Sequence, residues 1–181
     1  MLLQDFGYIE VDEIEPRSYR EIVAAWCAQR GERPFPLKEQ IDPFLVPTLA
    51  ANIILYEVAG EDLIIRVLGE KVVTNLGTGL KGRTLRQVLG DTDYTRLVER
   101  QLHDCAANGL PLYSRHDFRL PGDFVNPVTR KAWRIALPYG DEARVTRLLC
   151  YQLFSQDIQT HDRQDIDFEE LLPKTVFRIR V

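Results

Sequence analysis

The sequence predicts an α+β protein with a five-stranded antiparallel sheet, helices on one face of that sheet, and an amphipathic helix ahead of it. Two observations carry this prediction: an apolar stripe at helical spacing near the start, and strand-like runs grouped on either side of a longer helical segment. With 181 residues, 45% of them apolar and 28% charged, the chain has the size and composition of one globular domain with extensions.

The leading helix is expected over residues 17–30. Pro16 suits the start of a helix, and Gly31 suits its end. Since the apolar stripe of this helix lies outside the order of the core strands, we expect a partner to cover it. The sequence therefore predicts a homodimer through a stripe with i, i+3, i+4, i+7 spacing that consists of Tyr19, Ile22, Val23 and Trp26.

The remaining elements follow in the order two strands, short helices, a long helix over 92–108, and three strands. Alternating apolar residues and glycine turns predict the five strands at 52–58, 63–68, 110–120, 131–139 and 144–154.

Three regions follow from this order. Residues 1–48 are an N-terminal helical extension and a proline-rich connector, in which 6–11 is compatible with an edge strand. Residues 49–155 form the sheet domain. Residues 156–181 are an acidic C-terminal tail whose last six residues alternate apolar and basic side chains.

Charge and cysteine usage exclude several classes of protein. A net charge of −4 disfavours nucleic-acid binding, which needs a basic face. Cys27, Cys105 and Cys150 are odd in number and far apart, so they indicate a reducing compartment rather than disulfides or a zinc site. The sequence shows no signal peptide and no run near the roughly 20 apolar residues of a membrane helix. We therefore expect a cytoplasmic protein without membrane contact.

The recognisable motifs give no catalytic site. Residues 77–82 read GxGxxG but follow a short helix instead of a strand, so we expect a loop rather than a nucleotide site. His103 is rotated by about 100° from Leu102 on its helix, which predicts a solvent-facing side chain and no haem. We assign no catalytic residue and no metal, and any cofactor is left unidentified.

Two polar side chains are expected to face the interior. His116 shares the more apolar face of its strand, and Arg66 lies between apolar neighbours on its own face. Either internal partners satisfy them, or they are the polar groups of a cavity between the sheet and residues 69–108. The ligand-binding residues predicted for that cavity are Arg66, His116, Tyr56, Trp133 and Tyr151.

Short motifs at characteristic spacing add a resemblance. They are Trp26, Arg30-Gly31, Ile41-Asp42-Pro43, Arg66-Val67-Leu68-Gly69, Gly82-Arg83-Thr84-Leu85 and Leu137-Pro138. With the order of elements, they make residues 17–155 resemble the PAS-domain family, in particular single-domain PAS-like proteins of alphaproteobacteria. Residues 36–40 depart from the family pattern, and the segment beyond Phe154 has no counterpart in it.

The resemblance implies a sensory or regulatory module in signal transduction that binds a small ligand or a protein partner. The sequence contains no kinase, helix-turn-helix or cyclase motif, so we expect the protein to act through another, unidentified chain. Two alternatives stay open. One is a small cavity enzyme, an isomerase or hydrolase with His116 as its base. The other is a ligand-free dimerisation adaptor.

Overall fold

A computed structural model describes residues 6–118, 130–154 and 175–181, and a seven-stranded sheet lies at its centre. The order across the sheet is β1-β7-β4-β5-β6-β2-β3. Neighbouring strands are antiparallel, except that β1 and β7 are parallel. The strands are β1 (Gly7–Ile9), β2 (Ile53–Ala59), β3 (Asp62–Leu68), β4 (Leu112–Phe118), β5 (Arg130–Gly140), β6 (Val145–Phe154) and β7 (Thr175–Ile179).

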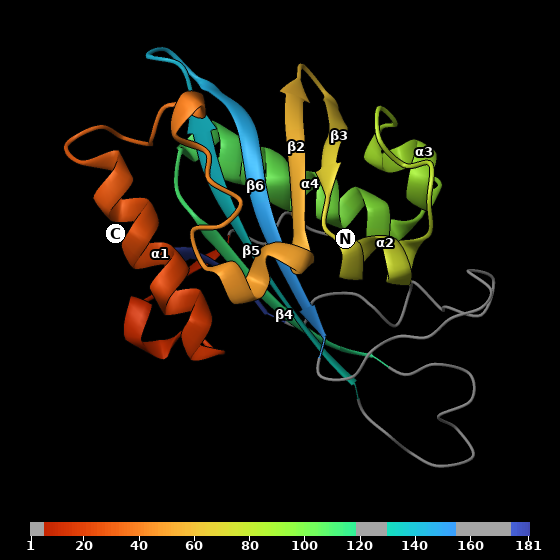
Figure 1. The fold of residues 1–181 in the computed structure, drawn as a ribbon, viewed down its shortest axis with the longest axis horizontal. Coiled ribbons are helices and arrows are strands. Elements are labelled where there is room, and N and C mark those ends of the chain that lie inside the picture. Colours follow the sequence, from red (N-terminus) through yellow and green to blue (C-terminus); the bar gives the residue numbers. More distant parts are fainter. Residues whose placement is uncertain (1–5, 119–129, 155–174) are drawn as a thin grey trace.

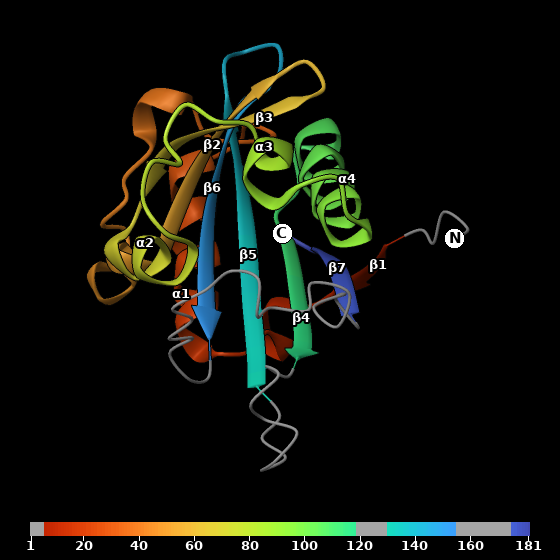
Figure 2. The same cartoon turned by 90° about the vertical axis from the view of Figure 1, so that its right-hand side faces the viewer.

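The prediction of five strands is wrong, because the segments on either side of the sheet domain each supply one more. β7 pairs with β4, and β1 pairs with β7, so both extra strands extend the same edge (Figure 2). β1 has three residues, which is too short for an alternation pattern. β7 pairs with a strand about sixty residues earlier in the chain, and no turn motif marks such a pairing.

Helices cover both faces of the sheet, in two layers (Figure 1). One layer consists of α2 (Glu70–Leu76), α3 (Leu85–Leu89) and α4 (Asp93–Asn108). The other consists of α1 (Arg17–Arg30) and the segments before and after it, with the short 3₁₀ turns η1 (Val11–Glu13), η2 (Lys38–Gln40) and η3 (Pro47–Asn52). The prediction of helices on one face is therefore incomplete, since the leading helix covers the second face.

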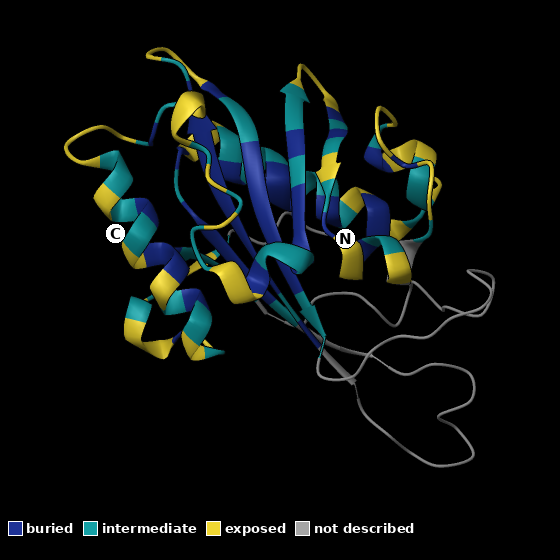
Figure 3. Cartoon of the chain, in the orientation of Figure 1, coloured by how far each residue is buried: buried dark blue, intermediate teal, exposed yellow. Residues whose placement is uncertain are grey.

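The apolar stripe of α1 is buried against its own sheet. Tyr19, Ile22, Val23 and Trp26 are each at most 1% exposed. The indole Nε1 of Trp26 donates to the carbonyl oxygen of Pro138 on β5 at 3.0 Å. Figure 3 shows α1 with buried residues toward the sheet and exposed residues on its outer side. The chain itself thus covers the surface that motivates the homodimer prediction, and the dimer stays untested.

Close packing of the chain explains one glycine of the recognised motifs. Gly69 lies between β3 and α2, and its N–H donates to the carbonyl oxygen of Ile53 at 2.9 Å. A Cβ at this position would overlap the carbonyl oxygen of Ala51. Only glycine lets the two backbones approach so closely.

None of the helices in the described ranges is long and apolar enough to cross a membrane.

Candidate ligand site between the sheet and helices α2 to α4

A row of three buried polar residues crosses the middle of the sheet. Ser114 on β4 lies opposite Arg134 on β5, and Arg134 lies opposite Gln152 on β6. Their exposed fractions are 0%, 8% and 5%. Ala132 and Ala136, two positions either side of Arg134, belong to the apolar cluster under α2, α3 and α4. Because alternate residues of a strand share a face, the row points into this layer.

The guanidinium of Arg134 is held by two neutral partners. Its Nε donates to Oε1 of Gln152 at 2.7 Å, and its Nη2 donates to the hydroxyl of Tyr94, on α4, at 3.0 Å. Its Nη1 is buried and has no hydrogen-bond partner in the described part of the chain. No carboxylate among the described residues pairs with this guanidinium.

Arg134 therefore carries a buried charge that its protein partners do not neutralise. An arginine side chain stays protonated in proteins. Burial lowers the pKa of the guanidinium, the oxygens of Tyr94 and Tyr56 raise it, and the net shift is upward. Removing such an ion from water costs several kcal/mol, roughly, and two neutral hydrogen bonds offset part of that cost. The layer is left with a fixed positive charge and an unused donor.

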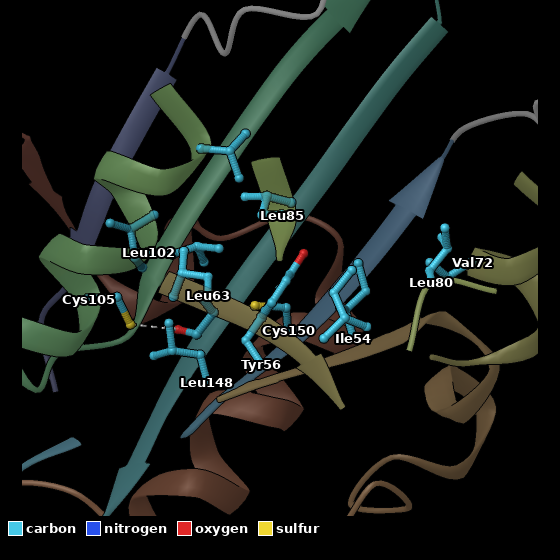
Figure 4. Close-up of a cluster of buried hydrophobic side chains, with 14 of the residues drawn as sticks. Ile54, Tyr56, Leu63, Val72, Leu80, Leu85, Leu102, Cys105, Leu148 and Cys150 are labelled. Carbon is cyan, nitrogen blue, oxygen red and sulfur yellow. Dashed lines mark hydrogen bonds between the residues drawn. The ribbon is translucent and has the colours of Figure 1, made fainter. Parts of the chain in front are cut away.

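Helix α4 presents more unused polar atoms to the same layer. Gln101 is 1% exposed, and neither its amide oxygen nor its amide nitrogen has a partner in the described ranges. It shares the buried face of α4 with Tyr94 and Cys105, seven positions before it and four after it. The Sγ of Cys105 donates to the carbonyl oxygen of Ala136 at 3.6 Å (Figure 4), which places this face over β5. The hydroxyl of Ser114 likewise has no partner among the described residues.

The surroundings of these polar groups are apolar. Figure 4 shows Tyr56 and Cys150 within the buried cluster of this layer. Burial and the neighbouring thiol of Cys150 raise the pKa of Tyr56, and burial raises the pKa of Cys150 to about 12. Both groups are therefore neutral at physiological pH, and they do not balance the charge of Arg134. The cluster includes Ile54, Leu63, Val72, Leu80, Leu85, Leu102 and Leu148.

This arrangement has the features of a binding site. It offers a cationic donor, an amide and hydroxyl groups in a buried, apolar setting, as ligand sites do. Burial raises the pKa of the Cys105 and Cys150 thiols, so neither is an activated nucleophile. In the ranges described, no group of three His, Cys, Asp or Glu residues could hold a metal ion.

The structure does not bring the five predicted ligand-binding residues together. Tyr56 lies in the layer under α2 to α4, whereas Trp133 and Tyr151 lie in the layer under α1. The hydroxyl of Tyr19 on α1 lies 2.8 Å from the carbonyl oxygen of Trp133 and 2.9 Å from that of Tyr151. Since both faces of β5 and β6 are covered, alternation of apolar residues did not identify which layer each side chain enters.

The prediction that Arg66 points into the interior is wrong. Its side chain is 43% exposed, and its Nε donates to Oε2 of Glu57 at 2.7 Å. Arg147 lies 3.4 Å from the same oxygen. The hydrogen bond from Arg66 lowers the pKa of the Glu57 carboxyl. The physical reason for the error is the position of β3 at the edge of the sheet: Leu63 and Ile65 point into the core, and Arg66 shares the opposite, half-exposed face with Ile64. A β-bulge, in which Val67 pairs with Leu55 and Ile65 with the next residue, leaves Arg66 as the extra residue of β3.

His116 lies on β4, where it pairs in register with Ala132. Its side chain lies outside the described ones, so its place in a ligand site stays a prediction. His103 is half-buried on α4, and its Nε2 lies 3.1 Å from the carbonyl oxygen of Glu61 in the β2–β3 turn. The GxGxxG segment, residues 77–82, connects α2 and α3.

Sequence reasoning missed the residues that form the polar row. Arg134 alternates with Ala132 and Ala136 on one face of its strand, and a charged residue between two alanines is a weak signal that the sequence does contain. Pairing of Arg134 with Ser114 and Gln152 depends on the register of three strands, which the sequence does not specify locally.

Comparison with known families agrees with this architecture. A family model described as a PAS domain matches residues 14–126, from the residues ahead of α1 to beyond β4. The chain belongs to the PAS-domain family. Strands β5, β6 and β7 of this PAS domain lie beyond the match, so two members of the polar row, Arg134 and Gln152, do too. PAS domains are in general sensory and regulatory modules rather than enzymes. No curated protein matches the chain.

Proposed function

We propose that this PAS domain is a sensory module that binds a small ligand between its sheet and helices α2 to α4. One observation carries the proposal: a set of buried polar atoms that lack partners within the described residues. Natural interiors pair nearly all such atoms, and each unpaired one costs roughly 1–3 kcal/mol. A polar ligand between α4 and β5 would satisfy them. Those in this layer are Nη1 of Arg134, Oγ of Ser114 and both amide atoms of Gln101.

The same contacts connect a ligand in this layer with the surface of the molecule, so that binding can change that surface. Arg134 on β5 is tied to α4 through Tyr94, and Asp104 on α4 accepts two hydrogen bonds from Arg178 on β7, at 2.9 and 2.7 Å. A ligand that changes the contact between Arg134 and Tyr94 would shift α4 and with it the outer edge of the sheet. We propose that this edge passes the signal to another chain.

We further propose that the protein works in the cytoplasm and that no residue of it is catalytic. Three free cysteines, two of them buried as protonated thiols, fit a reducing compartment. A homodimer remains part of the proposal, but any such contact would use a surface other than the stripe of α1, which is covered.

Native mass spectrometry of the purified protein tests ligand binding. We expect a bound small molecule that is released on denaturation and is absent from the Gln101→Leu variant, in which an apolar side chain of similar size replaces the amide. Glu21→Ala, on the exposed side of α1, is the control and should keep the ligand. If the wild-type mass shows no ligand and Gln101→Leu only stabilises the fold, the ligand-free adaptor is the better description.

A further inference from the structure

We propose that the ligand of this layer is an anion, a small organic acid whose carboxylate binds Arg134. The inference rests on the proposed function, whose site it uses, and it adds the chemical class of the ligand.

The geometry of the guanidinium leaves one of its edges available. Arginine has five N–H donors, and the hydrogen bonds to Gln152 and Tyr94 use one on Nε and one on Nη2. Both donors on Nη1 are unused within the described part of the protein. One of them, together with the second N–H of Nη2, forms the flat edge that a carboxylate engages with two parallel hydrogen bonds.

The charge of the layer favours an anion over a neutral ligand. Gln152 and Tyr94 hold Arg134 without neutralising it, and none of the carboxylates in the described ranges forms an ion pair with it. A neutral ligand would fill the hydrogen bonds of Nη1 and leave the buried charge unbalanced. A carboxylate would fill the hydrogen bonds of Nη1 and also balance the charge, through charge-assisted bonds about twice as strong as neutral ones.

The neighbours of Arg134 indicate what the rest of the acid resembles. On its own face of β5 the flanking residues are Ala132 and Ala136, and Ser114 lies opposite on β4, so small side chains surround the guanidinium. Beyond them the layer is lined by apolar and neutral aromatic side chains such as Tyr56 and Leu102. An acid with one carboxylate and a short apolar remainder matches this lining, whereas a polyanion such as a phosphorylated sugar does not.

A matched pair of probes separates charge from shape: sodium butyrate and its uncharged isostere butyramide, each compared with sodium chloride at the same concentration. We expect butyrate at about ten times its Kd to raise the melting temperature by roughly 3–6 °C, and butyramide to leave it unchanged. The Arg134→Gln variant should lose the response. Arg66→Gln, which changes an arginine in the exposed ion pair with Glu57, should keep it in full.

A second measurement does not depend on a variant that folds. In wild-type protein labelled with ¹⁵N at arginine Nε, butyrate should shift the resonance of the Arg134 Nε–H, and butyramide should not. An equal response to both probes, or a response that persists in Arg134→Gln, would overturn the anion inference while leaving a ligand site in place. No response to butyrate in either measurement also overturns it. The proposed function is then tested separately, by whether native mass spectrometry detects a bound ligand.

Discussion

At the scale of single residues, two arginines on the same sheet show how burial decides what a charge does. Arg66 is the extra residue of a bulge, lies 43% exposed and pairs with Glu57. Arg134 is 8% exposed and pairs with neutral groups only, among the residues described. The sequence places both beside apolar neighbours, yet an interior position is predicted for Arg66 and not for Arg134. The two arginines differ in whether the strand face that carries each one is covered, and this depends on strand order and register, which have no local sequence signal.

The three thiols give a prediction at the same scale. Burial raises the pKa of Cys150 to about 12 and raises the pKa of Cys105 well above its usual value. At pH 8, about one Cys150 thiol in ten thousand is then a thiolate, and only the thiolate reacts. Cys27 is half-buried. We expect a thiol reagent to label native protein at Cys27 alone, as measured by peptide mass spectrometry.

A Cys27→Ser variant is the control for this experiment, and it should resist labelling until a denaturant unfolds it. The rate at Cys27 should rise with pH between 7 and 9, because the raised pKa of its thiol keeps the thiolate a minority there. Labelling of Cys105 or Cys150 in the folded protein at a rate similar to that of Cys27 would show that the layer under α4 is open to solvent.

At the scale of elements, α1 illustrates both what the sequence specifies and what it leaves open. Its observed bounds, Arg17–Arg30, are those predicted, because the apolar stripe, Pro16 and Gly31 are all local signals. The surface that the stripe contacts is not local information. The sequence is compatible with a partner chain or with the second face of the sheet, and the structure shows the second face.

Truncation of Trp26 tests the contribution of that layer. Trp26→Ala should lower the free energy of unfolding by about 3–5 kcal/mol, because the indole is fully buried and bonds to the Pro138 carbonyl. Glu21→Ala on the exposed side of the same helix should change it by about 0.5 kcal/mol or less. Chemical denaturation monitored by circular dichroism measures both. A Trp26→Ala protein as stable as Glu21→Ala would mean that α1 detaches from the sheet in solution.

At the scale of the whole molecule, the five strands β2 to β6 lie where the sequence predicts them, because each has alternating apolar residues and nearby turn residues. The candidate site is less predictable. Its polar row is assembled from β4, β5 and β6, and its unpaired amide comes from α4. Tyr56 is the one predicted site residue whose described side chain lies in that layer. Such a site exists only after the strands are in register and α4 has packed on them.

The edge formed by β1 and β7 ties both flanking segments to the rest of the molecule. Ile179 on β7 is fully buried in the layer under α1, and Arg178 forms a partly buried ion pair with Asp104 on α4. β7 also covers the edge of β4 and is the strand on which β1 pairs. The strand thus contacts both layers, although the sequence predicts only a tail there.

Ending the chain after residue 174 should therefore destabilise the whole molecule and not only its edge. Loss of Ile179 alone removes a buried side chain worth about 2–5 kcal/mol, and the β4 edge left exposed should promote aggregation. Arg180→Ala is the matched control, since Arg180 forms an exposed ion pair with Glu10 that contributes about 1 kcal/mol at most. Urea denaturation and sedimentation velocity measure the two effects. If the shortened chain unfolds at the same urea concentration as Arg180→Ala and stays monodisperse, β7 does not contribute to the stability of the sheet. The proposed route from Arg134 through α4 to this edge then loses its end point.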